Sequence, residues 1–300
     1  TTPCGTITQL PWQEQFSTGI GECWYQMLGE MSDTITHASD LLQNNNGWKY
    51  NIYVGGERIY ADLSYEYAKY WIISPSFYLG EGDTTYQLSA DIFRTSLNGT
   101  GVAPMPNGDM FAILVSTDDG LTWNTANALI FGSGETSNYD YNLSAFSPEA
   151  SRVNFKLADE NDQPLTGAVR FAFYGEGSTS RMLVDNIEIS QWQPCQTPSM
   201  VNVANITSNS AELTFLDFGQ SQQWEYALQQ GNTIDFATAQ TQTINYQGTY
   251  LNDLLDGMTY SVAVRSVCSE GEYSSWSEII TFTTPSQPTP LPFETTFSDI

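Results

Sequence analysis

Apolar and polar residues alternate along several short stretches of this chain, as they do in half-buried β-strands. Clusters of Gly, Asn, Asp, Ser and Pro separate these stretches, and such clusters mark turns. Helical periodicity is nearly absent. Many short strands separated by turns predict an all-β protein built from antiparallel sandwiches. The strands that the pattern predicts are 86–93, 110–116, 169–175, 182–190, 211–215, 260–267 and 279–284.

Two proline-containing stretches divide the chain. Residues 191–200, QWQPCQTPSM, place two prolines and a cysteine between a predicted strand and a new alternating pattern. Residues 283–292 contain four prolines, and we expect them to form a stiff, extended spacer. These breaks predict one domain over 4–192, a second over 195–284, and a linker with the first strand of a further module over 285–300.

The two ends of the chain repeat each other. LPWQEQFSTGI at 10–20 aligns with LPFETTFSDI at 291–300, and TTP occurs at both 1–3 and 283–285. An offset of 281 to 282 residues indicates a long repeat of which little more than one period is present. We therefore expect residues 1–3 to be the tail of a preceding module, and the whole segment to be a monomeric part of a tandem array.

Composition adds a strong negative charge to this picture. The 300 residues contain 9 Lys and Arg against 34 Asp and Glu, which gives a formal net charge of −25. This charge repels phosphate backbones and anionic membrane surfaces, so nucleic acid is not an expected partner. It suits hard cations such as calcium, although solubility alone explains it equally well. Membrane insertion is not expected, because no stretch is apolar over the roughly 18 residues that a spanning helix needs.

Four widely spaced cysteines, Cys4, Cys23, Cys195 and Cys268, bear on the compartment of the protein. None lies in a C-x-x-C pair and the chain has one histidine, so a zinc site is poorly supported. An even number of cysteines fits two disulfides and an oxidising compartment, and therefore a secreted or cell-surface location. Of the three pairings, we favour Cys4–Cys23 and Cys195–Cys268, because each pair then lies within one predicted domain.

The second predicted domain resembles a fibronectin type III module. The matching segments are NITSNSAELTF (205–215), WEYAL (224–228), LLDGMTYSVAVRSV (254–267) and SSWSEIITFTTP (274–285). The third of these resembles the L-x-P-G-x-x-Y-x-V-x-V signature of the family and places Tyr260 at its tyrosine corner. Phe215 stands where the family usually has a tryptophan. The two cysteines of this domain resemble those of versions found in secreted Bacteroidetes proteins.

The first predicted domain resembles the MAM-like jelly rolls, a group that includes the cleaved-adhesin modules of bacterial surface proteins. The matching segments, in chain order, are PWQEQF (11–16), ECWYQ (22–26), YWIISPSFYL (70–79), VSTDDGLTW (115–123) and LVDNIEI (183–189). In MAM domains the cysteine of the second segment pairs with one at the start of the domain. The resemblance implies a jelly-roll β-sandwich, followed along the chain by the fibronectin type III β-sandwich.

The jelly-roll resemblance also implies a structural calcium ion between the first and last strands. It places Glu14 on the first strand and Asp185 on the last. Asp33 and backbone carbonyls would then complete the six to eight oxygens that calcium takes. Such an ion would tie both ends of the sandwich together. The alternative is that Glu14 and Asp185 are ordinary acids at strand ends.

Aromatic residues are concentrated between residues 48 and 71. Trp48, Tyr50, Tyr65 and Tyr67 are candidate ligand-binding residues, because flat aromatic rings stack on sugars and tyrosine adds a hydroxyl. This would suit a carbohydrate-binding surface. The alternative is that these residues form the sandwich core and half-exposed strand positions, and it is the stronger of the two interpretations.

Residues 116–123, STDDGLTW, fit the Asp-box pattern S-x-D-x-G-x-T-W, a hairpin that is usually structural. The pattern predicts that Asp118 accepts hydrogen bonds from turn amides, that Gly120 takes a positive φ, and that Trp123 packs under the hairpin. No catalytic residue is predicted. The single histidine, His37, has no neighbouring nucleophile signature, and no motif selects a pair of catalytic carboxylates.

Together these features predict a non-catalytic adhesion segment of a larger secreted or cell-surface protein. The jelly roll would bind an extracellular glycan or protein, and the fibronectin type III module would act as a spacer. An alternative is that both domains are accessory parts of a secreted peptidase or glycoside hydrolase whose catalytic domain lies outside these residues. A third interpretation is that both domains form a stalk.

Overall fold

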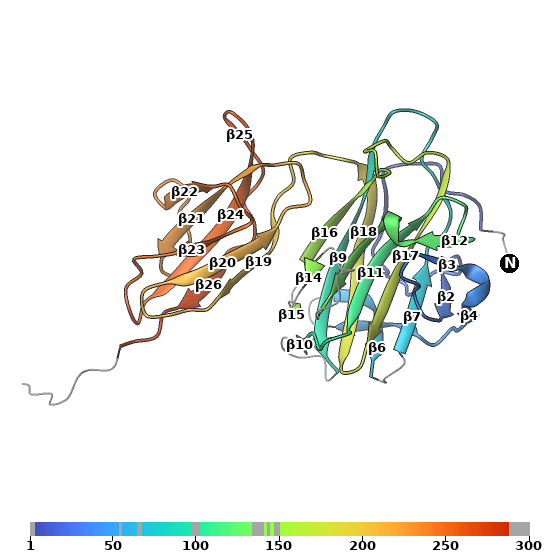
Figure 1. The fold of residues 1–300 in the computed structure, drawn as a ribbon, viewed down its shortest axis with the longest axis horizontal. Coiled ribbons are helices and arrows are strands. Elements are labelled where there is room, and N and C mark those ends of the chain that lie inside the picture. Colours follow the sequence, from blue (N-terminus) through green and yellow to red (C-terminus); the bar gives the residue numbers. More distant parts are fainter. Residues whose placement is uncertain are drawn as a thin grey trace, which may run out of the picture. The chain divides into compact units, whose positions relative to one another are not determined.

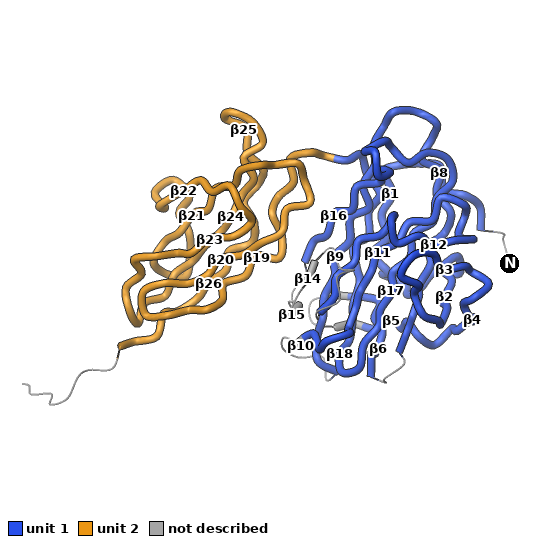
Figure 2. Tube along the Cα trace, in the orientation of Figure 1, with its two compact units in different colours: residues 1–192 blue, residues 193–300 orange. Residues whose placement is uncertain are grey.

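The chain is all-β and folds into two compact units, residues 1–192 and 193–300 (Figure 2). The division falls after Trp192, inside the stretch expected to separate two domains. The described part of the chain has two short 3₁₀-helices, η1 Ala38–Asp40 and η2 Thr125–Asn127, and no helix there is long and apolar enough to cross a membrane. The computed structural model describes residues 4–53, 56–64, 68–97, 103–133, 141–142, 145–146 and 151–287.

Two large sheets form most of the first unit (Figure 1), and in its described residues two two-stranded sheets accompany them, β12 Thr122–Asn124 with β3 Ile35–His37 and β10 Ala103–Pro104 with β15 Ala145–Phe146. The first sheet has the order β16-β9-β18-β6-β5, and β1 pairs with β18. Its strands are β1 Trp12–Glu14, β5 Trp48–Tyr53, β6 Gly56–Leu63, β9 Tyr86–Ser96, β16 Ser151–Leu157 and β18 Ser180–Gln191. The second sheet has the order β14-β13-β11-β17-β7-β2-β4, and β8 pairs with β17. Its strands are β2 Tyr25–Leu28, β4 Leu42–Gln43, β7 Ala68–Ile73, β8 Phe77–Tyr78, β11 Met110–Ser116, β13 Ala128–Gly132, β14 Tyr141–Asn142 and β17 Ala168–Gly177.

The main core of this unit lies between its two sheets. Leu88, Ala90 and Ile92 alternate along β9 and are fully buried, as the alternating sequence predicts. Gly175 of β17 lies against Leu63 of β6, where a Cβ atom would come within 3.4 Å of the leucine side chain. A Cβ atom there would make ordinary van der Waals contact with this leucine, so the inner faces of the two sheets pack directly against each other at this point. The unit is therefore a β-sandwich, the architecture that the jelly-roll resemblance implies, whereas the MAM-like relationship itself stays a prediction.

A second apolar cluster covers the outer face of the second sheet. The Trp71 ring lies 6.1 Å from that of Trp123 and 4.9 Å from that of Tyr174. Trp123 belongs to β12 Thr122–Asn124, which pairs with β3 Ile35–His37 and follows the Asp-box turn. In that turn Asp118 accepts a hydrogen bond from the Thr122 amide at 2.9 Å, Gly120 has φ +90°, and Trp123 is fully buried. The structural prediction for the Asp-box is confirmed.

A buried ion pair connects the two sheets. Arg94 points to the core side of β9 and pairs with Asp109, which directly precedes β11. The side chains are 0% and 4% exposed, so neither charge reaches water. Burial raises the pKa of Asp109 and lowers that of Arg94, while each partner opposes the shift of the other. The carboxylate also accepts the backbone amide of Ser178, which ties the β17–β18 connection to the same point.

The second unit is a two-sheet sandwich with the strand arrangement of a fibronectin type III module (Figure 1). One sheet has the order β19-β20-β23, and in the other β22-β21-β24 is extended by β25 and β26, which both pair with β24. Its strands are β19 Ser199–Ala204, β20 Ala211–Leu216, β21 Gln223–Gln230, β22 Gln240–Ile244, β23 Gly248–Leu251, β24 Thr259–Ser269, β25 Glu272–Tyr273 and β26 Ile280–Thr283.

Local features of this sandwich match the sequence predictions. The Tyr260 hydroxyl accepts the Leu255 amide at 2.8 Å, which forms the expected tyrosine corner. Phe215, at the usual tryptophan position, is buried and packs against Trp224 with ring centroids 5.7 Å apart.

Both expected disulfides are present. Cys4 pairs with Cys23 in the first unit, and Cys195 pairs with Cys268 in the second. The expectations for residues 1–3 and 291–300 fall outside the described residues.

Candidate functional site

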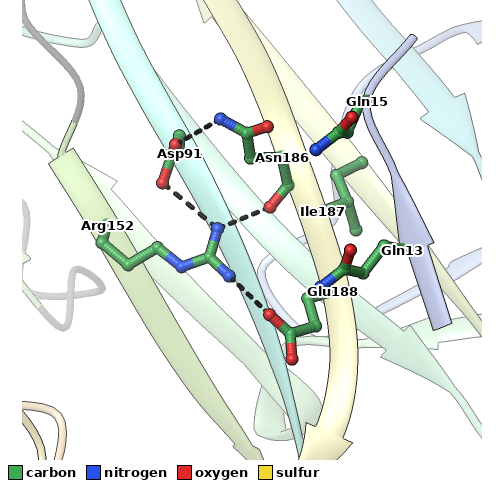
Figure 3. Close-up of a pocket in the computed structure, with 7 residues that line it drawn as sticks. All are labelled: Gln13, Gln15, Asp91, Arg152, Asn186, Ile187 and Glu188. Atoms are coloured by element: carbon green, nitrogen blue, oxygen red, sulfur yellow. Dashed lines mark hydrogen bonds and ion pairs between the residues drawn. The ribbon is translucent and has the colours of Figure 1, made fainter. Parts of the chain in front are cut away.

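A polar hollow of about 380 Å³ lies on the first sheet where β1, β9, β16 and β18 run side by side (Figure 3). This depression is called the polar hollow. Arg152 extends from β16 across β9 toward β18, and the two glutamines come from the β1 side. Its lining residues are Gln13, Gln15, Asp91, Arg152, Asn186, Ile187 and Glu188.

An irregularity in β18 shapes the hollow. The pairing of β18 with β9 shifts between Asp185 and Glu188, and Asn186 has a φ of +46°. Such a bulge turns side chains and carbonyls away from their regular directions. Asn186 consequently donates through its side chain to Asp91 Oδ2 at 2.8 Å, while its carbonyl faces Arg152.

The guanidinium of Arg152 is fixed by three acceptors. Its Nη1 lies 3.2 Å from Asp91 Oδ1 and 2.5 Å from the Asn186 carbonyl oxygen, and its Nη2 lies 3.2 Å from Glu188 Oε2. The Arg152 side chain is still 34% exposed. The hollow therefore presents a planar cation between two carboxylates, with the exposed amides of Gln13 and Gln15 nearby.

A second arginine lies close to Asp185 on the same sheet. Arg58 of β6 is 3.8 Å from the Asp185 carboxylate, and its guanidinium lies 3.9 Å from the centroid of the Phe93 ring. Burial raises the pKa of Asp185, and the negative charges of Asp91 and Glu14 add to this rise. The Asn186 amide and Arg58 oppose it.

The predicted calcium ligands are only partly brought together. Glu14 and Asp185 lie on the paired strands β1 and β18, and Glu14 accepts the Phe16 amide at 2.8 Å. Asp33 lies elsewhere, before β3, where its carbonyl accepts a hydrogen bond from the Thr125 hydroxyl at 2.9 Å. Within the ranges that the structure describes, no three Asp, Glu, His or Cys side chains are grouped so as to hold a metal ion.

Nearby cations also argue against a metal at this place. Arg58 already lies beside Asp185, and Arg152 already bridges Asp91 and Glu188. A calcium ion next to these carboxylates would face two guanidinium groups and would gain less from the acids. The residues of the described strands therefore do not fit the predicted calcium shell.

The aromatic residues that are predicted to bind a ligand differ in their exposure where the structure describes them. Trp48 is 2% exposed and lies in the core, so it is not available to stack on a ligand, and its assignment as a binding residue is corrected. Trp48 lies on the core side of β5, a property that the aromatic composition of the segment does not reveal. Tyr50 is half-buried on the same strand, and its pKa is raised by burial and by a hydrogen bond with Glu57. Tyr65 and Tyr67 lie outside the described residues.

Sequence reasoning did not find the residues that form the polar hollow. Asp91 and Arg152 lie 61 positions apart, and no motif connects them. The available signal was the Asp185-Asn186 pair inside LVDNIEI, where two consecutive polar residues interrupt the alternation and indicate a bulge. His37 is exposed on β3 and does not line the hollow.

No protein-family model and no curated protein matches this chain. Among solved structures it is similar to a fibronectin type III domain of the human collagen alpha-1(XX) chain, at 18% identity and a TM-score of 0.28, covering 33% of this chain and 92% of that one. A fibronectin type III domain of human contactin 1 matches at 16% identity and a TM-score of 0.30, covering 33% and 86%. The FN5 domain of Drosophila Lar matches at 14% identity and a TM-score of 0.27, covering 31% and 99%.

These matches cover about a third of the chain. The fibronectin type III character of the second unit rests on its own strand order and its tyrosine corner. The class that the fold defines is thus an all-β protein of two sandwiches, the second of fibronectin type III type.

Proposed function

We propose that this chain is a non-catalytic recognition segment of a larger secreted or cell-surface protein, and that its first unit binds a glycan at the polar hollow. The observation that carries the proposal is the fixed Arg152 guanidinium beside the exposed amides of Gln13 and Gln15. The planar guanidinium donates hydrogen bonds in fixed directions and the glutamine amides both donate and accept them, which suits the neighbouring hydroxyls of a sugar. A volume of about 380 Å³ lies within the range of small-ligand sites.

The second unit would hold the first at a distance from a neighbouring module. One disulfide in each unit supports an oxidising compartment, and thus secretion or display at the cell surface. No catalytic role is assigned to either unit. Binding would use hydrogen bonds and shape rather than covalent chemistry.

The test is a binding screen of the whole chain against arrayed glycans and extracellular proteins. Replacing both exposed glutamines, Gln13→Ala with Gln15→Ala, is expected to weaken glycan binding at least about tenfold, because each amide supplies hydrogen bonds that alanine lacks. Gln43→Ala, an exposed glutamine on β4 away from the hollow, is the matched control and should bind normally.

Three outcomes would contradict the proposal. Glycan binding that survives the double substitution would move the site elsewhere. Binding of a protein but of no glycan would replace the ligand class. If the folded chain binds neither any glycan nor any protein on the arrays, the interpretation of both domains as a stalk is favoured.

A further inference from the structure

The second unit, expected to be a spacer, has a polar groove of its own. The groove has a volume of about 780 Å³ and lies at one end of the sheet formed by β22, β21 and β24, beside the β24–β25 turn. Four side-chain amides line it, together with one aromatic ring. We call it the amide groove, and these residues are Gln220, Gln222, Gln223, Asn245 and Tyr273.

The walls of the amide groove are held in place by the fold. Gln223 donates through its side-chain amide to Asn245 Oδ1 at 3.0 Å, which joins β21 to the residue after β22. The backbone N–H of Gln220 donates to the Pro194 carbonyl at 3.0 Å. Cys268 forms part of the lining and is bonded to Cys195, next to that proline. Such fixed walls reduce the conformational entropy that a ligand must remove on binding.

A column of stacked side chains supports the aromatic end of the groove. The Arg265 guanidinium lies 3.8 Å from the centroid of Tyr273 and 4.4 Å from that of Trp276. Glu225 fixes the arginine through a 2.7 Å bond to its Nε, and Trp276 stacks in turn on Phe236 at 4.8 Å. Tyr273 nevertheless remains 43% exposed. Its ring is thus a firm, partly open platform at the edge of the groove.

The charge of the groove differs from that of the chain. The protein carries a formal net charge of −25, yet Glu270 is the one carboxylate among the residues that line this groove. A nearly neutral lining gives little attraction to a charged ligand. Amides and hydroxyls that both donate and accept hydrogen bonds match a neutral polyol, and an aromatic ring packs against the C–H face of a sugar.

We propose that the amide groove is a second binding site and that its ligand is a neutral oligosaccharide. The volume of the groove falls within the roughly 300–1,000 Å³ of small-ligand sites. The fibronectin type III unit would then contribute to recognition directly. This inference is independent of the polar hollow, because the two sites share no residue.

The experiment uses the whole chain and a panel of neutral glucan, mannan, galactan and xylan oligosaccharides. Sialylated and sulfated glycans and a set of unmodified peptides are included for comparison. Binding is followed by calorimetry and by backbone amide shifts in NMR spectra. We expect a neutral oligosaccharide to bind and to shift the amides of residues 220–223 and 243–245.

Three variants and a control locate the site. Gln220→Ala with Gln222→Ala alters two exposed loop side chains and is expected to weaken binding at least about tenfold. Tyr273→Ala should abolish binding, whereas Tyr273→Phe keeps the ring and should keep most of it. Tyr246→Ala changes a tyrosine that is 80% exposed and does not line the groove, so it should have no effect.

Several binding results would overturn the proposal for the amide groove. The proposal is overturned if no neutral oligosaccharide binds, if the glutamine double variant binds as tightly as the parent, or if only charged glycans or peptides bind. Binding that Gln13→Ala with Gln15→Ala removes and the groove variants leave intact belongs to the polar hollow. That result would overturn the amide groove while leaving the first proposal standing.

Discussion

Replacing Asp109 by asparagine would test whether the buried ion pair holds the two sheets of the first unit together. The substitution keeps the shape of the side chain but removes its charge, so Arg94 would stay buried without a counter-ion. Both side chains are nearly inaccessible, at 0% and 4% exposure, so water cannot replace the lost partner. Breaking a buried pair in this way costs about 3–5 kcal/mol of the free energy of unfolding.

The expected loss can be read from the melting of the first unit. A change of 1 kcal/mol shifts the midpoint by about 2–4 °C in a domain of 150–250 residues, so Asp109→Asn should lower it by roughly 6–20 °C. Differential scanning calorimetry of the whole chain measures this. The transition of the second unit should keep its midpoint and serves as an internal reference.

A second substitution distinguishes the stability lost with the ion pair itself from the stability lost because Arg94 stays charged and buried without a partner. Adding Arg94→Met to Asp109→Asn removes the unpaired cation and should restore most of the lost stability, because apolar replacement of a buried pair is often nearly neutral. Asp162→Asn breaks the exposed pair with Lys156 and is the matched control, with an expected effect below about 1 kcal/mol. A single variant as stable as the control, or a double variant no better than the single one, would refute the reasoning.

Three further predictions follow from other parts of the structure. Burial alone would raise the pKa of Asp118, but hydrogen bonds from Ser116 and Thr122 lower it, so its contribution to stability is present above the unfolded-state pKa and is lost as the pH falls through the lower folded-state pKa. The melting midpoint of Asp118→Asn should therefore fall less steeply with decreasing pH than that of the parent. An identical fall of the midpoint at acid pH in both proteins would count against this. Replacing Cys195 and Cys268 by serine opens a loop of 73 residues and should lower the free energy of unfolding of the second unit by about 4 kcal/mol, because the unfolded chain gains conformational entropy. Denaturant unfolding measures this loss, and a loss under about 1 kcal/mol would contradict the prediction. Because Arg58 and Arg152 lie against the acids of the first sheet, a chelator should leave the melting midpoint of the first unit within about 1 °C, and a rise of several degrees on adding calcium would show that the metal binds there after all.

The parts of the fold that could be predicted are those encoded locally. The stretch 110–116 coincides with β11, because a short, nearly continuous apolar run bounded by turn residues is typical of a strand that is buried on both faces. The tyrosine corner and the Asp-box turn were also predictable, since each motif forms its own hydrogen bonds within a few residues. The two-residue strands β4 and β8 were not, because so short a segment has no period to read.

The candidate sites depend on information that a sequence does not carry. Asp91 and Arg152 meet only because β9 and β16 pair in one register. The aromatic residues could be counted, but the buried and exposed faces of their strands could not be told apart. For this reason the sequence alone makes Trp48 a candidate for a binding surface, although its side chain lies in the core. The amide groove likewise joins a loop, a strand end and a turn whose proximity follows from the sandwich topology.

The Cys195–Cys268 disulfide determines how the second unit would respond to mechanical tension. Cys195 lies near the start of this unit, and its partner lies on β24, so force entering along the backbone passes directly to that strand. Strands β19 to β23 lie between the two cysteines and are shielded from the load. At about 3.4 Å per residue, the closed segment of 73 residues withholds roughly 250 Å of contour length until the bond is reduced. Under load the oxidised unit is therefore a linker that yields only a short length, and its extension is set by the redox state of one bond.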